Sequence, residues 1–118
     1  MPINNHINYI EFFVTDLTET KLFYGNCFGW EFEDFGPKYT AFSGSGVAGG
    51  FEFTDKPIIR GGVLIVIYHE NLKEVEEVIK ANGGKIVVPI FSFPGGSRFQ
   101  FLDPSGNELS VWCHTQNQ

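Results

Sequence analysis

The chain has 118 residues and a formal net charge of -6, and its eight Lys and Arg form no dense run. This length fits one domain with a real core, and the lack of a basic surface argues against nucleic acid as a partner. The longest apolar run, 63–68, is far shorter than the roughly 20 residues that cross a bilayer. The first residues also lack the layout of a signal peptide. We therefore expect no membrane partner and a cytoplasmic protein in which Cys27 and Cys113 are reduced thiols.

Aromatic residues are unusually frequent, at 16% of the chain with 13 Phe. So many rings are typical of a large apolar cavity or an interface. A core that is simply rich in phenylalanine explains them equally well. Composition alone leaves both interpretations open.

The first half of the chain reads as strand, helix and three strands. A strand around 9–14 leads to Asp16, a good helix N-cap with Glu19 three residues on. The helix has an apolar stripe at i, i+3, i+4 and i+7 and stops at Gly29. Its stripe residues are Thr20, Phe23, Tyr24 and Cys27. Strands are expected near 30–33, 39–42 and 50–53.

The second half repeats this pattern at an offset of 55 residues. A strand around 64–68 leads to the N-cap Asn71, with Glu74 three residues on, and the helix stops at Gly83 and Gly84. Its stripe consists of Val75, Val78, Ile79 and Asn82. Strands are expected at 85–90, 98–102 and 107–112, and residues 91–97 as a hairpin loop that could cover a cleft.

Each half therefore reads β-α-β-β-β. We place module one at about 7–53, a polar linker at 54–62 and module two at about 63–113, within a single domain spanning 1–118. Two strand-helix units can resemble each other by chance. Here the helix N-cap, the apolar stripe and the terminating glycine all match at one offset, which favours a true repeat.

Three short motifs lie in this frame: "VTDL" before the first helix, "FYGNCFGW" at its end, and "DPSGN" before the last strand. In this order and spacing they resemble the vicinal oxygen chelate superfamily, which includes glyoxalase I, bleomycin-resistance proteins and extradiol dioxygenases. The resemblance implies an α+β fold in which two tandem modules form a curved mixed sheet around a cleft, with the helices outside. It also implies a homodimer and a small-molecule ligand.

Enzymes of this superfamily hold a divalent metal in the cleft through His or Glu on the first and last strands of each module. The matching positions here carry Tyr9, Leu64 and Ser110, which are poor ligands for such an ion. The fourth position falls in 49–53, where either Glu52 or Phe51 projects inward. Three histidines remain, and we expect each to be exposed at a chain end or in a loop; they are His6, His69 and His114. We therefore predict no metal and no cofactor.

Strand parity predicts what lines the cleft instead, because alternate residues of a strand share a face. Aromatic and apolar groups predominate there, and the 91–97 loop adds further candidates including Phe91. The predicted cleft residues are Tyr9, Glu11, Phe13, Phe51, Leu64, Phe93, Arg98, Glu108, Ser110 and Trp112.

The two carboxylates of this set, Glu11 and Glu108, have three open interpretations. Each could pair with Arg98, Lys85 or a backbone N–H and hold the modules in register. Each could instead anchor a cationic ligand, or act as an acid or base. The structural role is the favoured one.

The leading functional hypothesis is a binding protein that holds an aromatic or amphipathic small molecule without a metal and is not an enzyme. The alternative is a glyoxalase-like lyase or isomerase, or a dioxygenase, with a rearranged metal site. A third hypothesis is a remnant fold that serves only in assembly. The residues do not identify the ligand.

Overall fold

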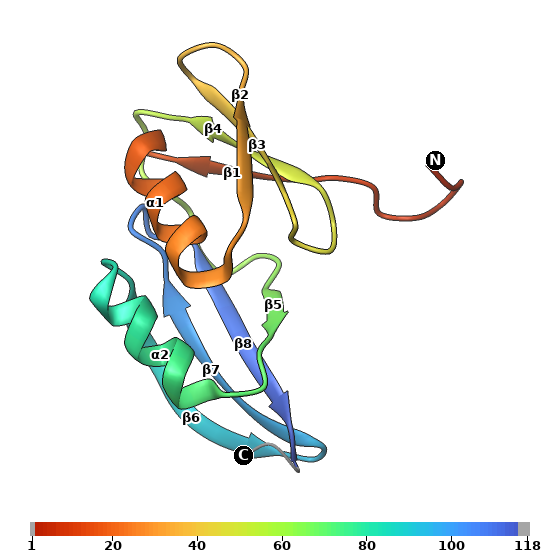
Figure 1. Ribbon diagram of the computed structural model, residues 1–118, viewed down its shortest axis with the longest axis vertical. Coiled ribbons are helices and arrows are strands. Elements are labelled where there is room, and N and C mark those ends of the chain that lie inside the picture. Colours follow the sequence, from red (N-terminus) through yellow and green to blue (C-terminus); the bar gives the residue numbers. More distant parts are fainter. Residues whose placement is uncertain (1, 116–118) are drawn as a thin grey trace.

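Two four-stranded sheets, each accompanied by one helix, make up the computed structural model, which describes residues 2–115 (Figure 1). The first sheet has the order β1-β4-β3-β2 and the second β5-β8-β7-β6. In each sheet the first and last strands of the module run parallel, and the other neighbours are antiparallel. The α+β fold of two repeated modules is confirmed. Its elements are β1 (Ile10–Val14), α1 (Leu17–Phe28), β2 (Glu31–Asp34), β3 (Tyr39–Ser43), β4 (Gly49–Phe53), β5 (Ile65–Tyr68), α2 (Leu72–Ala81), β6 (Lys85–Phe93), β7 (Gly96–Leu102) and β8 (Glu108–His114).

The helices begin at the predicted caps. The Asp16 carboxylate accepts from the Glu19 backbone N–H at 2.9 Å, and the Asn71 side chain accepts from that of Glu74 at 3.1 Å. These bonds satisfy N–H groups that have no partner within the helix. At the other end of α1, Gly29 has φ 74°, in the left-handed region where glycine carries no penalty. Both module helices are therefore fixed by local sequence.

The hairpin between β6 and β7 is tighter than predicted. The expected loop 91–97 is wrong in extent, because β6 continues to Phe93 and pairs with Gly96 across a two-residue turn. Proline at position 94 and glycine at position 95, with φ 102°, suit such a turn. The longer hairpin leaves two phenylalanines on a strand, where the pairing fixes their direction.

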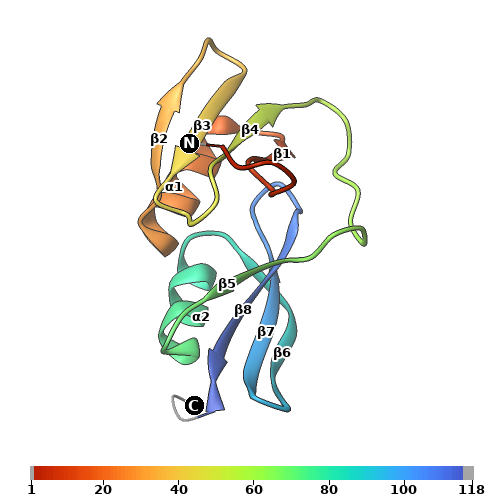
Figure 2. The same ribbon diagram turned by 90° about the vertical axis from the view of Figure 1, so that its right-hand side faces the viewer.

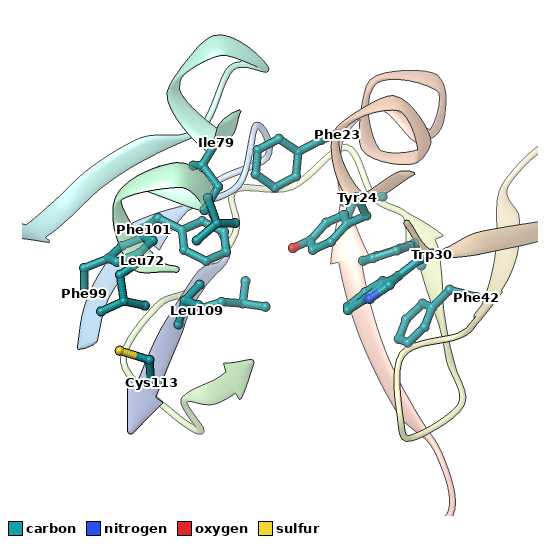
Figure 3. Close-up of a cluster of buried hydrophobic side chains, with 14 residues drawn as sticks. Phe23, Tyr24, Trp30, Phe42, Leu72, Ile79, Phe99, Phe101, Leu109 and Cys113 are labelled. Atoms are coloured by element: carbon teal, nitrogen blue, oxygen red, sulfur yellow. The ribbon is translucent and has the colours of Figure 1, made fainter. Parts of the chain in front are cut away.

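One aromatic core serves both modules. Phe23 of α1 packs against Phe101 of β7 with ring centroids 6.0 Å apart, and Phe28 contacts the same ring at 6.1 Å. Figure 3 shows Tyr24, Trp30 and Phe42 of the first module pointing toward the buried side chains of the second. We call the side of each sheet that packs on this core its inner face and the other side its open face. Since both inner faces share the core, both open faces point outward.

The "DPSGN" turn between β7 and β8 joins the modules. The Tyr24 hydroxyl donates to the Asp103 carboxylate at 2.8 Å, and the Thr15 backbone N–H donates to the Ser105 hydroxyl at 2.9 Å. The Asn107 amide donates to a backbone oxygen of β1 at 2.9 Å. The turn therefore docks the second module on the first, in addition to reversing the direction of the chain. Figure 2 shows how the two sheets lie one above the other with the helices on one side.

No helix within residues 2–115 has the length and apolar character needed to span a membrane.

Candidate functional site

The open face of the first sheet carries a hydrogen-bonded group of two phenols and a carboxylate. The Tyr39 hydroxyl of β3 donates to Glu11 Oε1 of β1 at 3.0 Å, and it also shares a hydrogen bond with the Tyr9 hydroxyl. Burial, helped by the bonds to Tyr9 and Glu11, raises the pKa of Tyr39. Tyr39 is therefore a neutral donor at physiological pH, and its proton is directed at the carboxylate. This bond supports the structural interpretation of Glu11, with Tyr39 as a partner that was not predicted from the sequence.

Gly50 of β4 makes room for this group. A Cβ atom built at Gly50 would overlap the hydroxyls of Tyr39 and Tyr9, so only glycine fits beneath the two phenols. Tyr39 was missed at the sequence level. Adjacent glycines at 49 and 50 inside a strand pattern were the available sign that another group approaches closely there.

The open face of the second sheet brings together three predicted site residues, one of which is a cation. The Arg98 guanidinium of β7 lies 5.2 Å from the ring centre of Phe91 and 5.8 Å from that of Phe93. Arg98 pairs in register with Trp112 of β8, whose ring lies 6.5 Å from Phe93. Tyr68 of β5 completes the group, with its ring 5.3 Å from Trp112. We call Arg98 with these four rings the arginine-aromatic face.

Glu108 lies on the same open face but is engaged elsewhere. Its Oε1 accepts from Arg60 of the linker at 3.2 Å, and its Oε2 accepts from the Gln100 amide at 2.8 Å. Neither of its two expected charged partners, Arg98 and Lys85, is used in these bonds. The structural role of Glu108 is supported, with Arg60 and Gln100 as the missed residues.

Two predicted cleft residues are closed to a ligand. Phe51 is fully buried on the inner face, with its ring 4.9 Å from Tyr24 and 5.0 Å from Phe42, so the prediction that it lines a cleft is wrong. Glu52 takes the open side of β4 instead, in register with Phe13. Ser110 is also fully buried, and its hydroxyl donates to the Phe99 carbonyl at 2.8 Å, so it is not available to a ligand.

The remaining predicted residues do not share a single cleft in this chain. Glu11 and Phe13 line a cavity of about 500 Å³ between the first sheet and the linker. Leu64 lines a separate groove of about 660 Å³ between the modules, where Trp30 and Tyr68 also lie. Phe93, Arg98, Glu108 and Trp112 belong to the outward face of the second sheet. The predicted cleft residues are thus divided among the cavity beside the linker, the groove between the modules and the open face of the second sheet.

The groove between the modules also exposes part of Cys27 at its wall. Burial raises the pKa of the Cys27 thiol to about 12, so the group is neutral and a poor nucleophile at physiological pH. Cys113 is fully buried. Neither cysteine is a candidate for covalent chemistry.

The positions where related enzymes bind a metal do not fit one here. Tyr9 is engaged with Tyr39, Leu64 offers only hydrocarbon, and the Ser110 hydroxyl is buried and donates to the backbone. His69 caps a turn, since its Nδ1 accepts from the Asn71 N–H at 2.9 Å. Over residues 2–115, no group of three or more His, Cys, Asp or Glu side chains is placed to hold an ion. A divalent metal needs several converging donors, which these residues do not provide.

A protein-family model matches most of this sequence. The model of the Glyoxalase/Bleomycin resistance protein/Dioxygenase superfamily covers residues 6–111. The chain belongs to this superfamily. No curated protein matches the chain.

Solved structures of the superfamily share the fold. A glyoxalase-related enzyme from Fulvimarina pelagi has a TM-score of 0.79 at 20% identity, covering 93% of this chain and 88% of its own. The E126Q mutant of the fosfomycin resistance protein FosX from Listeria monocytogenes has a TM-score of 0.79 at 24% identity, covering 96% and 91%. TioX from Micromonospora sp. ML1 has a TM-score of 0.70 at 17% identity, covering 93% and 99%. That FosX mutant was solved with Mn(II) and a dihydroxypropylphosphonic acid, whereas residues 2–115 of this superfamily member place no group of three or more His, Cys, Asp or Glu side chains to hold such an ion.

Proposed function

We propose that this chain binds a small organic molecule with an aromatic or amphipathic body, and that it does so without a metal. The observation that carries the proposal is the arginine-aromatic face, where two rings contact one cation and two more rings continue the same outward sheet surface. Sites for small molecules are mostly apolar and ring-lined, with a few polar groups that orient the ligand. The side chains at the superfamily's metal positions support the metal-free form of the proposal.

The exposure of these rings adds support. Tyr68 on the edge strand β5 is 43% exposed, and Trp112 is partly exposed although β8 is paired on both sides. Large aromatic rings that are partly exposed together on one face indicate a binding surface. A purely structural remnant would be expected to fill this face with its own side chains.

The experiment is a titration of the purified protein with 2-naphthalenemethanol, a neutral two-ring alcohol, followed by calorimetry. We expect saturable binding, because the flat ring system can stack on Trp112. The variant Trp112→Ala should weaken it roughly two- to tenfold, since one aromatic contact contributes about 0.5–1.5 kcal/mol beyond area burial.

Phe35→Ala is the matched control, because Phe35 is an exposed ring, at 59%, on the other module. It should leave binding unchanged. Treatment with a chelator should also have no effect. Binding that disappears with the chelator and returns with Mn(II) would overturn the proposal in favour of the metal-dependent lyase, isomerase or dioxygenase.

We also propose that the chain forms a homodimer. Strands β1 and β5 each lie at the edge of a sheet, and the apolar side chains beside these edges are exposed. Ile7 is 79% exposed and Val63 85%. Edge strands with exposed apolar neighbours favour pairing with another chain. Sedimentation velocity should give twice the chain mass, and a single monomeric species at micromolar concentration would refute the dimer.

We further propose a cytoplasmic location, which rests on Cys27 and Cys113 being free thiols. Fractionation of cells that produce the protein would test it.

A further inference from the structure

The arginine of the arginine-aromatic face has no counter-charge among the residues that the structure describes. Over residues 2–115, the ion pairs of the chain involve Lys21, Arg60 and Lys80, and Arg98 takes part in none of them. Its Nε is buried and lacks a hydrogen-bond partner. The chain has 14 Asp and Glu against eight Lys and Arg, so carboxylates are plentiful elsewhere. An unpaired guanidinium is therefore a specific feature of this face and does not reflect a lack of acidic residues.

The nearest acid on the same face cannot serve this role in the observed arrangement. Glu108 lies opposite Leu102, four residues along β7 from Arg98. Both of its oxygens are engaged, one by Arg60 at 3.2 Å and the other by Gln100 at 2.8 Å. The pairing of Glu108 leaves Arg98 without a neutralising group.

The ring contacts of Arg98 leave the plane of its guanidinium without an acceptor from residues 2–115. The rings of Phe91 and Phe93 lie near the guanidinium carbon, at 5.2 and 5.8 Å, within the range for a cation–π contact. Such contacts use the face of a guanidinium, whereas its N–H donors lie in its plane and form a fork that matches a carboxylate. Nε itself is covered, whereas Arg98 as a whole is partly exposed, so we place the incoming oxyanion on the terminal N–H groups of the guanidinium.

The surrounding surface specifies the rest of the ligand. Trp112 stands beside Arg98 in register, and it contacts the rings of Tyr68 at 5.3 Å and His114 at 4.8 Å. This places an apolar platform next to one positive charge. A single cation in a chain of net charge -6 favours a monoanion over a dianion. A flat ring bearing one carboxylate satisfies both requirements.

We propose that Arg98 binds the carboxylate of an aromatic acid whose ring stacks on Trp112. This inference rests on the proposed function and names the ligand class for that same face. Phe91 and Phe93 contact the guanidinium, and Glu108 is bound by Gln100 and Arg60.

The test compares 2-naphthoate with 2-naphthalenemethanol, two ligands that share a ring system and differ in charge. Calorimetry should show that wild-type protein prefers naphthoate by roughly 10- to 100-fold, the range expected for charge-assisted hydrogen bonds. Arg98→Gln should abolish this preference and leave the affinity for the alcohol within a factor of about two to three. Arg98→Lys, which keeps the charge but loses the fork, should show an intermediate preference.

Lys73→Gln is the matched control, because it removes one positive charge from an exposed position on α2. It should keep the preference for naphthoate. If wild type binds both ligands equally, the inference is overturned while the proposed function stands. If neither ligand binds at millimolar concentration, both are overturned. The wild-type comparison remains decisive even if Arg98→Gln does not fold.

Discussion

Replacing Asp103 by alanine is expected to lower the free energy of unfolding by about 3 kcal/mol, because it removes the acceptor at the centre of the docking turn. Asp103 Oδ1 accepts from the backbone N–H groups of Ser105, Gly106 and Asn107 at 3.0, 2.9 and 2.9 Å. Oδ2 accepts from the Tyr24 hydroxyl, which is fully buried. Alanine would leave that hydroxyl without its partner inside the core. Urea unfolding followed by far-UV circular dichroism measures the loss.

Two further variants separate hydrogen bonding from general turn effects. Asp103→Asn keeps the shape and one acceptor oxygen, so we expect it to cost less than half as much as alanine. Asp55→Ala alters an exposed aspartate and should change stability by less than about 0.5 kcal/mol. An Asp103→Ala protein as stable as wild type would contradict the docking role of the turn.

The stability of Asp103→Asn relative to wild type should depend on pH. Burial raises the pKa of Asp103 above its ordinary value of 3.8, although hydrogen bonds from Tyr24 and Asn107 oppose the rise. The stability contributed by the neutral carboxyl is complete below pH 3.8 and is lost as the pH rises through the raised pKa. Asparagine has no charge to bury. The stability of Asp103→Asn relative to that of wild type should therefore rise as the pH increases through the raised pKa.

Local features of the fold could be predicted because local residues determine them. Asp16 and Asn71 start the two helices as expected, and Gly29 ends the first. The last strand also divides as parity predicted, with Leu109 and Val111 fully buried on the inner face. These features depend on residues within a few positions of one another, and the pattern of one sequence contains them.

Features that depend on distant pairing could not be predicted in the same way. The register of β4 is set by its pairing with β1 and β3, and this pairing places Glu52 on the open face. Shifts of register between Ile86 and Phe91 in β6 likewise have no local sign. The division of the expected cleft follows from how the "DPSGN" turn docks on α1 and β1, which is a contact between modules. The sequence shows which residues of a strand share a face. It does not show which strands will pair with it, and that pairing decides which face packs on the core.

Replacing Phe51 by alanine is the second change expected to have a large effect, a loss of about 3 to 5 kcal/mol in the free energy of unfolding. Phe51 is fully buried, and its ring lies 5.4, 4.9 and 5.0 Å from those of Phe12, Tyr24 and Phe42. The cavity left behind would be bounded by other rings, which have little freedom to close it.

The matched control is Phe53→Ala, two residues along the same strand, where the side chain is 37% exposed. It should cost well under half as much, because much of its surface already meets water. Urea unfolding of both variants gives the comparison. If Phe51 instead lined a ligand site, Phe51→Ala would weaken binding of 2-naphthalenemethanol while leaving stability nearly unchanged. That result would reverse the assignment of β4 faces and, with it, the placement of Glu11, Tyr39 and Glu52 on the open side of the first sheet.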